Sequence, residues 1–557
     1  MRVTSLSLRS FFRSVLVSFL LNSVLLFSPD FKMRCISSME VIWSAPFECP
    51  FRPIVIRHTS DESGECRSSG FYQNIIRTLG GERLITPVTL GDVHVLIENL
   101  QKAVESGRSL GASYIEIRGE SGFIEYIQMD DLRVTALTQR VEQGAAVRVL
   151  ADGAWGFVST GSLDSLETAV KNATSIAKAA AKTRREPIEL VDVEPHEHVI
   201  EARPERDPRD VPIEEKLQYM KDMTKVIQDY DERVAAVTIR VRTMSGKKFL
   251  VTSDGVRLES PTLLVWAYPW VTAKEGTRLS AARYEEASTH QGWEYLEQVA
   301  TPEFVGTAAA KRAKLQIEGV PAKAGEFPCV MGPRVIGVLA HEALGHLAEA
   351  DLTVNSAFAG KTGEVVAAEG VSMTDDGTLA GNLGTAQFDD EGVPASRVEI
   401  IKDSVLTELM TNREYAAKIG QRPTGNARAE SYRYPPIIRM RNTFFELGDH
   451  ARDELFEGIK FGYYCGDFRG GQAQTNASFQ VGIQEAYEIV DGELEKPVTD
   501  LSISGIATDS LFKIEGISKE PFDWEVGRCG KGQEAFVASG GPEIRFAAGG
   551  IIFGGRN

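Results

Sequence analysis

The sequence predicts an α+β, multi-domain protein with an N-terminal α/β unit, a central α/β unit and a sheet-rich C-terminal domain. The chain has 557 residues, which is more than one hydrophobic core usually supports. Helical and strand-like patterns are mixed up to about residue 318, whereas glycine-rich, β-prone segments dominate from there onward. Because strands and helices do not alternate regularly, a doubly wound fold is disfavoured.

Residues 1–88 form an N-terminal extension of irregular pattern. Its apolar stretch, residues 15–27, would extend roughly 20 Å as a helix, which is short of the ~30 Å hydrocarbon core of a membrane, so we expect no membrane span. The stretch fits a signal peptide without a clean cleavage site, or a mis-assigned start upstream of Met33 or Met39. Six scattered cysteines without a CxxC pair favour a reducing, cytoplasmic location, with export as the alternative.

Three further units are expected at residues 89–190, 191–318 and 319–557. In the first, apolar residues at helical spacing from Val93 to Val104 predict a helix. Asp152-Gly153, between two β-prone runs, predicts a hairpin. The second unit begins with a charged, proline-rich connection and ends with a helix around residues 302–317.

The net charge of −17 argues against direct binding to nucleic acid. An acidic protein repels a phosphate backbone unless a basic cluster offsets the repulsion, and the sequence contains no long run of Lys or Arg. We therefore expect no direct nucleic-acid partner.

The segment "HEALGHLAEAD", residues 341–351, holds a His-Glu pair and a second histidine. On a regular helix, His341 and His346 would point about 140° apart and could not share one ion. A wider π turn would bring them to the same side, and Gly345 is where a distortion costs least. The alternative is an ordinary helix, in which His341 is hydrogen-bonded in a core and His346 caps the helix end.

A catalytic zinc site needs a third protein ligand, and two cysteines are candidates. Cys529 lies in "GRCGKGQ", where flexible glycines and a lysine favour a thiolate that can approach an ion closely. Cys465, in "GYYCGDFRGGQ", is either a ligand or a buried strand residue. Residue chemistry prefers Cys529 and leaves Cys465 open.

Several motifs together resemble the TldD/PmbA family, and in particular its TldD branch. They occur in the order expected for that family and cover roughly residues 90–550, while residues 1–88 have no counterpart in the usual pattern. The motifs are "GAAVRVLADGAWGF", "HEALGHLAEAD", "FAGKTGE", "RPTGNARAESYRYPPIIRMRNTF", "GDFRGGQAQTNASFQVGIQEAYEIVDGEL" and "GRCGKGQ".

The resemblance implies that residues 319–557 form a metalloprotease domain. It implies one Zn²⁺ per catalytic chain, held by His341, His346 and Cys529, with Glu342 as the catalytic base. The expected substrate is a small unfolded peptide or protein. The expected assembly is a homodimer or a heterodimer with a PmbA-like subunit, which lacks the metal motif.

A peptide substrate could add as a strand to a sheet edge in the β-rich region 395–490. Gly470 and Gly471 are candidate substrate-binding residues because they leave the backbone open to close approach, although a plain hairpin turn explains them equally well. The alternative function is a non-catalytic peptide-binding or regulatory subunit of a TldD/PmbA-type complex.

Overall fold

A computed structural model describes residues 93–202 and 204–555, all of which belong to one structural unit of the chain, residues 87–557. The expected N-terminal extension and its apolar stretch lie outside the described residues. Among the helices in the described ranges, none is long and apolar enough to cross a membrane.

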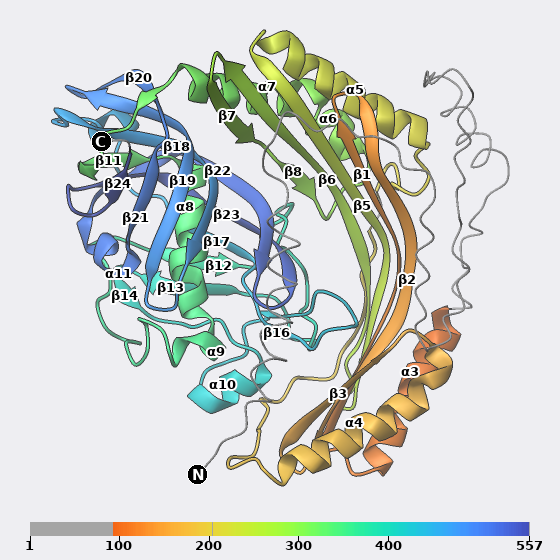
Figure 1. Ribbon diagram of the computed structural model, residues 1–557. Helices are drawn as coiled ribbons and strands as arrows, with labels where there is room; N and C mark the ends of the chain where they lie inside the picture. The colour runs from red at the N-terminus through yellow and green to blue at the C-terminus, as the bar shows by residue number, and fades with distance from the viewer. Residues whose placement is uncertain (1–92, 203, 556–557) are drawn as a thin grey trace, which may run out of the picture. The chain divides into compact units, whose positions relative to one another are not determined.

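An eight-stranded sheet combines strands from the two units expected at 89–190 and 191–318 (Figure 1). Its strand order is β3-β2-β1-β5-β6-β4, and β7 and β8 also pair with β6. The long strands β1 and β5 run antiparallel, from the pair Glu116–Thr252 to the pair Asp130–Thr238. The strands are β1 (Tyr114–Asp130), β2 (Arg133–Ala151), β3 (Ala154–Thr160), β4 (Glu197–Val199), β5 (Val234–Thr252), β6 (Arg257–Glu275), β7 (Arg278–Arg283) and β8 (Glu286–Ser288).

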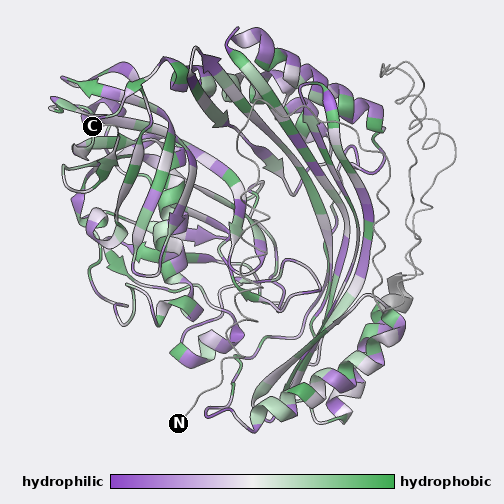
Figure 2. Cartoon of the chain, viewed as in Figure 1, coloured by the Kyte–Doolittle hydropathy of each residue, from purple (hydrophilic) through white to green (hydrophobic). Residues whose placement is uncertain are grey.

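Helices cover one face of this sheet (Figure 1). Odd-numbered residues of β1, such as Ile115 and Ile117, pack into one core with α3 and α4, and Ile127 packs into another with α5 and α7. Because side chains alternate along a strand, even-numbered residues point to the opposite face, and Figure 2 shows hydrophobic and hydrophilic positions alternating along these strands. The helices are α3 (Val93–Ser109), α4 (Leu166–Ala181), α5 (Ile213–Tyr230), α6 (Glu294–Gln298) and α7 (Pro302–Glu318), with the 3₁₀ turn η1 (Leu163–Ser165).

A fourteen-stranded sheet forms the C-terminal region, and its main strand order is β10-β24-β21-β19-β18-β11-β23-β17-β12-β13-β14. Off this order, β20 pairs with β19 and with β9, and β22 pairs with β23. The strands are β9 (Val320–Pro321), β10 (Gly325–Glu326), β11 (Cys329–Met331), β12 (Met373–Asp376), β13 (Arg397–Lys402), β14 (Val405–Leu406), β17 (Asn442–Phe445), β18 (Phe461–Ala473), β19 (Ser478–Val490), β20 (Glu493–Thr499), β21 (Ser502–Ile506), β22 (Ile514–Gly530), β23 (Glu534–Phe546) and β24 (Ile552–Gly554). A separate pair is β15 (Ala427–Arg428) and β16 (Ile437–Ile438).

A short apolar helix, α8 (Pro333–Val338), packs against β18, β22 and β23 of this sheet. All six of its residues are buried, as expected for a helix enclosed by a core. The remaining helical elements are η2 (Leu339–Leu344), η3 (Gly345–Ala348), α9 (Ala350–Thr353), α10 (Arg413–Ile419), η4 (Arg452–Leu455), α11 (Ala507–Ser510) and η5 (Leu511–Lys513). The α+β class and the sheet-rich C-terminal region are confirmed.

Candidate metal centre

The helix that carries the two histidines changes its winding within a few residues. Helix α8 passes into a π-helix, η2, and then into a 3₁₀ turn, η3, which begins at Gly345. The wider π turn places residues five apart on the same side, and the rings of His341 and His346 have their centroids 5.2 Å apart. The π turn that the five-residue spacing of the histidines requires is therefore present, and the regular-helix alternative is wrong.

Gly345 is required for space and not for backbone freedom. Its φ of −58° is an ordinary right-handed helical value. A Cβ at this position would lie 2.1 Å from Met440 Sδ. The glycine therefore allows the helix to approach the segment before β17 closely.

Cys529, near the end of β22, completes a cluster with the two histidines. One ligand atom from each of His341, His346 and Cys529 lies within 4.8 Å of the others. Cys529 Sγ is 3.2 Å from His346 Nε2. Cys465 instead lies in the core beside β11, and burial raises the pKa of its thiol to about 12.

The charges in this cluster stabilise one another. Burial raises the pKa of the Cys529 thiol, but the charges of His341 and His346 and the hydrogen bond with His346 outweigh burial and lower the pKa to about 4. Burial lowers the pKa of His346, but Glu349 and the thiolate raise it to about 10. Burial likewise opposes the charged form of His341, but the Cys529 thiolate raises the pKa of this imidazole. At neutral pH the cluster therefore pairs the Cys529 thiolate with a protonated His346.

His341 has an unusual environment for a buried histidine. It is 4% exposed, and neither Nδ1 nor Nε2 has a hydrogen-bond partner in the described structure. Buried polar nitrogens are usually satisfied by a hydrogen bond or a metal ion. His341 is buried, as the core-histidine alternative expects, but its ring nitrogens face the Cys529 thiolate and His346 and are available to a metal ion.

A buried ionic network orients His346. Its Nδ1 donates a hydrogen bond of 2.8 Å to Glu349 Oε2, which leaves Nε2 directed at Cys529. Glu349 is fully buried and also lies 3.1 Å from Lys531 Nζ. Lys531 donates further hydrogen bonds to both carboxylate oxygens of Asp351, at 2.7 and 2.8 Å. Lys531 and Cys529 come from the same hairpin tip, so this network joins the histidine segment to the cysteine loop.

Two arginines, the buried Arg439 and the half-buried Arg428, hydrogen-bond to the backbone of that hairpin. Arg439 donates hydrogen bonds to the carbonyls of Cys529, at 2.6 Å, and of Gln533, at 2.5 Å. Arg428 donates to the carbonyl of Phe536 at 2.7 Å. Both arginines belong to "RPTGNARAESYRYPPIIRMRNTF", for which sequence reasoning gave no role. The density of arginine among apolar residues was the available signal.

Glu342 lies beside the cluster without a fixed partner. It is half-buried, and no hydrogen bond or ion pair of its carboxylate is found among the described residues. Its charge contributes to raising the pKa of His341. A carboxylate next to a candidate ligand histidine, with no hydrogen bond or ion pair among the described residues, is available for proton transfer.

Gly470 and Gly471 lie within β18, opposite Gly482 and Val481 of β19. The hairpin-turn interpretation is therefore wrong. Strand β11 pairs with β18 only up to Cys465, so in the described structure this part of β18 has a strand partner on one side only. No described contact joins the two glycines to the histidine–cysteine cluster.

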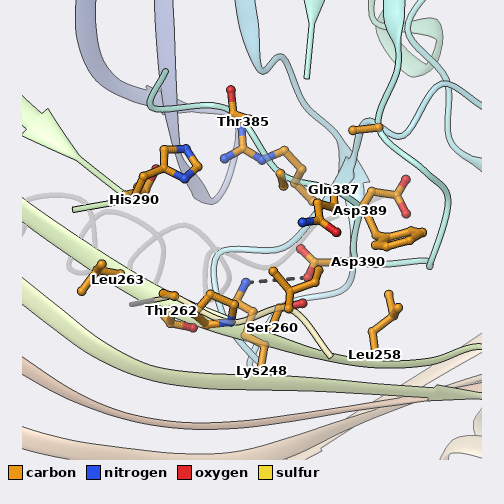
Figure 3. A pocket seen from close by; sticks show the side chains of 18 of the residues that line it. Lys248, Leu258, Ser260, Thr262, Leu263, His290, Thr385, Gln387, Asp389 and Asp390 are labelled. Carbon is orange, nitrogen blue, oxygen red and sulfur yellow. Dashed lines mark ion pairs between the residues drawn. The ribbon is translucent and has the colours of Figure 1, made fainter. Parts of the chain in front are cut away.

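A cavity of about 810 Å³ lies apart from this cluster (Figure 3). Residues from β5, β6 and the loop around residues 385–390 line it, and none of the three cluster residues does. Figure 3 shows Lys248 and Asp390 facing each other in the cavity, and their charged atoms are 3.6 Å apart.

Comparison with known proteins matches most of the described unit to one family. Three family profiles match in chain order, as the PmbA/TldA metallopeptidase domain 1, central domain and C-terminal domain. They match residues 115–177, 206–317 and 324–551.

Individual relatives agree with the profiles. The chain is 33% identical over 460 residues to a metalloprotease of Methanocaldococcus jannaschii, covering 81% of this chain and 99% of that protein. It is 31% identical to the zinc metalloprotease TldD homolog of Saccharolobus solfataricus, covering 80% of this chain and 97% of that protein. The crystal structure of TldE from Thermococcus kodakarensis shares the fold, with a TM-score of 0.65, 19% identity and coverage of 82% of this chain and 100% of TldE.

Proposed function

The chain belongs to the PmbA/TldD metallopeptidase family and is a TldD-like metalloprotease, and from this premise we propose that it is a zinc-dependent peptidase acting on small unfolded peptides. The observation that carries the proposal is the meeting of His341, His346 and Cys529. These side chains come from two distant segments and share one small volume.

The three side chains suit zinc as a set. Zinc prefers imidazole nitrogen and thiolate sulfur, and catalytic sites commonly use three protein ligands and leave one position open. The low pKa of Cys529 and the unpartnered nitrogens of His341 match that requirement. We propose one Zn²⁺ per chain at this site. When bound, zinc supplies Lewis acidity toward a peptide carbonyl and a water molecule.

Glu342 is proposed as the general base. An oxygen of its carboxylate accepts a proton from the attacking water, and the same carboxyl group then donates that proton to the nitrogen of the leaving amine. Glu349, through His346 Nδ1, keeps the imidazole in the orientation that directs Nε2 toward the ligand cluster.

An extended peptide is the proposed substrate form. The unpaired side of β18 at Gly470 and Gly471 offers backbone groups to which an added strand can hydrogen-bond, with no side chain in the way. We further propose a cytoplasmic location and an assembly of two similar subunits, either two copies of this chain or this chain with a PmbA-like partner.

The test combines metal analysis with one substitution. The parent should contain about one zinc per chain and cleave a denatured peptide, as followed by mass spectrometry. Glu342→Gln should retain zinc and lose roughly 10²–10⁴-fold in cleavage rate, the usual contribution of a general base. Glu364→Gln, at an exposed position, is the matched control and should behave like the parent.

Two results would contradict the proposal. If Glu342→Gln cleaves as fast as the parent, Glu342 is not the base. If the zinc-loaded parent binds peptides but cleaves none, the chain is a non-catalytic peptide-binding or regulatory subunit.

A further inference from the structure

The face of the first sheet opposite the helices carries arginine and aromatic side chains in cross-strand register. Tyr126, Arg242 and Trp266 stand opposite one another on β1, β5 and β6. In the neighbouring row, Arg240 stands opposite Tyr268. The rings of Trp266 and Tyr268 are stacked, with centroids 5.3 Å apart. We call these five residues the arginine–aromatic face.

The hairpin tip that carries Cys529 lies over this face. Arg528 and Glu534 of the tip line a cavity of about 560 Å³ together with the arginine–aromatic face. The Arg528 guanidinium is 4.9 Å from the centre of the Trp266 ring. The face therefore lies next to the loop that supplies a proposed zinc ligand.

Arg528 and Cys529 leave opposite sides of β22, because successive side chains of a strand alternate. A peptide that occupies the cavity and reaches the zinc ligands must pass around the hairpin. Crossing a strand and its side chains takes on the order of 10 Å, or about three to four extended residues at roughly 3.3 Å each. A bound segment would thus lie several residues from the bond that is cleaved.

The two arginines at the centre of the face lack full charge compensation. Arg240 forms no ion pair within the described structure, and its hydrogen-bond partner there is the neutral Gln128 Oε1, at 3.2 Å. Arg242 lies 3.9 Å from Glu534, whose carboxylate is already bound by Arg528 at 3.1 and 3.2 Å. Burial and the nearby Arg528 lower the pKa of Arg242.

The side chains that line this cavity carry an excess of positive charge, although the protein as a whole is acidic. Four arginines and two glutamates line it, and the full chain carries a net charge of −17. This local excess of positive charge attracts an anionic group. Guanidinium groups bind carboxylates through paired hydrogen bonds, and the half-buried rings of Tyr126 and Tyr268 can pack against the rest of a peptide, while the buried Trp266 supports the face from below.

We propose that the arginine–aromatic face binds an acidic segment of the peptide substrate, several residues away from the cleaved bond. This inference rests on the proposed peptidase function for the identity of the ligand as a substrate. Arginine with aromatic rings can also bind single-stranded nucleic acid. The acidic peptide is favoured because the net charge of the chain repels a polyanionic backbone, whereas one short acidic segment needs only the local charge.

Equilibrium binding to the full chain tests the proposal. Fluorescence anisotropy would compare a labelled twelve-residue peptide carrying a central run of Asp and Glu with the same peptide carrying Asn and Gln. The acidic peptide should bind the parent roughly tenfold more tightly, and high salt should remove the difference. The double variant Arg240→Gln/Arg242→Gln should bind both peptides equally.

Two further variants keep the test specific. Lys102→Gln/Arg108→Gln removes the same charge from exposed positions on α3, which packs on the opposite face, and should keep the acidic preference. Arg240→Glu reverses the charge at one position and should favour a lysine-containing peptide. It gives an answer even if the double variant does not fold.

Several outcomes would overturn the inference. It fails if the double variant keeps the acidic preference, or if single-stranded DNA displaces the acidic peptide from the parent at lower concentration than unlabelled peptide does. In cleavage assays, acidic and amide peptides should differ about tenfold in KM with similar kcat. Equal KM values would refute the inference and leave the peptidase proposal intact. Arginine-dependent acidic binding without any cleavage would refute only the peptidase proposal.

Discussion

Replacing Glu349 with glutamine tests whether a buried carboxylate sets the geometry of the proposed zinc site. Glu349 accepts the hydrogen bond from His346 Nδ1 at 2.8 Å and lies 3.1 Å from Lys531 Nζ. Burial raises the pKa of this carboxyl, but His346 and Lys531 outweigh burial and lower the pKa. The group is therefore an ionised carboxylate at neutral pH.

The expected loss of zinc affinity and of stability in Glu349→Gln depends on which atoms lose a hydrogen-bond partner. The amide oxygen of glutamine can occupy the position of Oε2 and still accept a hydrogen bond, but it carries no charge to hold the imidazole. Loss of such a supporting partner costs 10–100-fold in metal affinity. We expect the lower end of this range, a loss of zinc affinity of about tenfold or ~1.4 kcal/mol. The reason is that Lys531 still donates hydrogen bonds to Asp351 and to the Ile438 carbonyl in the variant. The free energy of unfolding should fall by roughly 1–2 kcal/mol, since a charge-assisted bond becomes a neutral one.

The effect on stability should depend on pH. A carboxyl whose pKa is lower in the folded state stabilises the fold above its ordinary pKa of 4.5 and loses that contribution as the pH falls through the folded value. The difference in unfolding free energy between parent and Glu349→Gln should therefore be full at pH 7 and shrink in acid.

The assay is competition for zinc against a fluorescent chelator, with urea unfolding of the metal-free proteins alongside. Glu364→Gln is the matched control, because its side chain is exposed, and its zinc Kd should stay within twofold of the parent. If folded Glu349→Gln binds zinc as tightly as the parent, the carboxylate does not position His346.

Two further predictions concern the hairpin tip. Arg439→Met removes the donor to the carbonyls of Cys529 and Gln533. The free energy of unfolding measured in urea should fall by roughly 2–3 kcal/mol. An unchanged urea midpoint would show that the arginine does not hold the tip. In zinc-free protein, thiolate absorbance near 240 nm should persist down to about pH 4 in the parent and be missing from Cys529→Ser. A transition near pH 9 that is present in the parent and missing from Cys529→Ser would show that the imidazoles do not stabilise the thiolate.

Local sequence was sufficient to predict the helices and hairpins of the first two units. The predicted hairpin at Asp152-Gly153 joins β2 to β3, and the helix expected around residues 302–317 is α7. Turn residues and apolar periodicity act over a few neighbouring positions, so these elements can be identified without knowledge of the fold. Pairing of β1 with β5 could not be predicted in this way, because it joins segments more than a hundred residues apart.

The sequence by itself determined which side chains are suited to bind a metal: two histidines five apart, an intervening glutamate, and a cysteine flanked by glycines. Only the tertiary structure decided that the helix unwinds into a π turn, and it brings the histidines to Cys529, the cysteine that residue chemistry preferred, while Cys465 is buried beside β11. It also revealed the contacts of Glu349, Lys531 and Arg439. The reason is physical: residue type fixes what a group can bind, whereas strand register and burial across distant segments fix which groups meet and which remain charged.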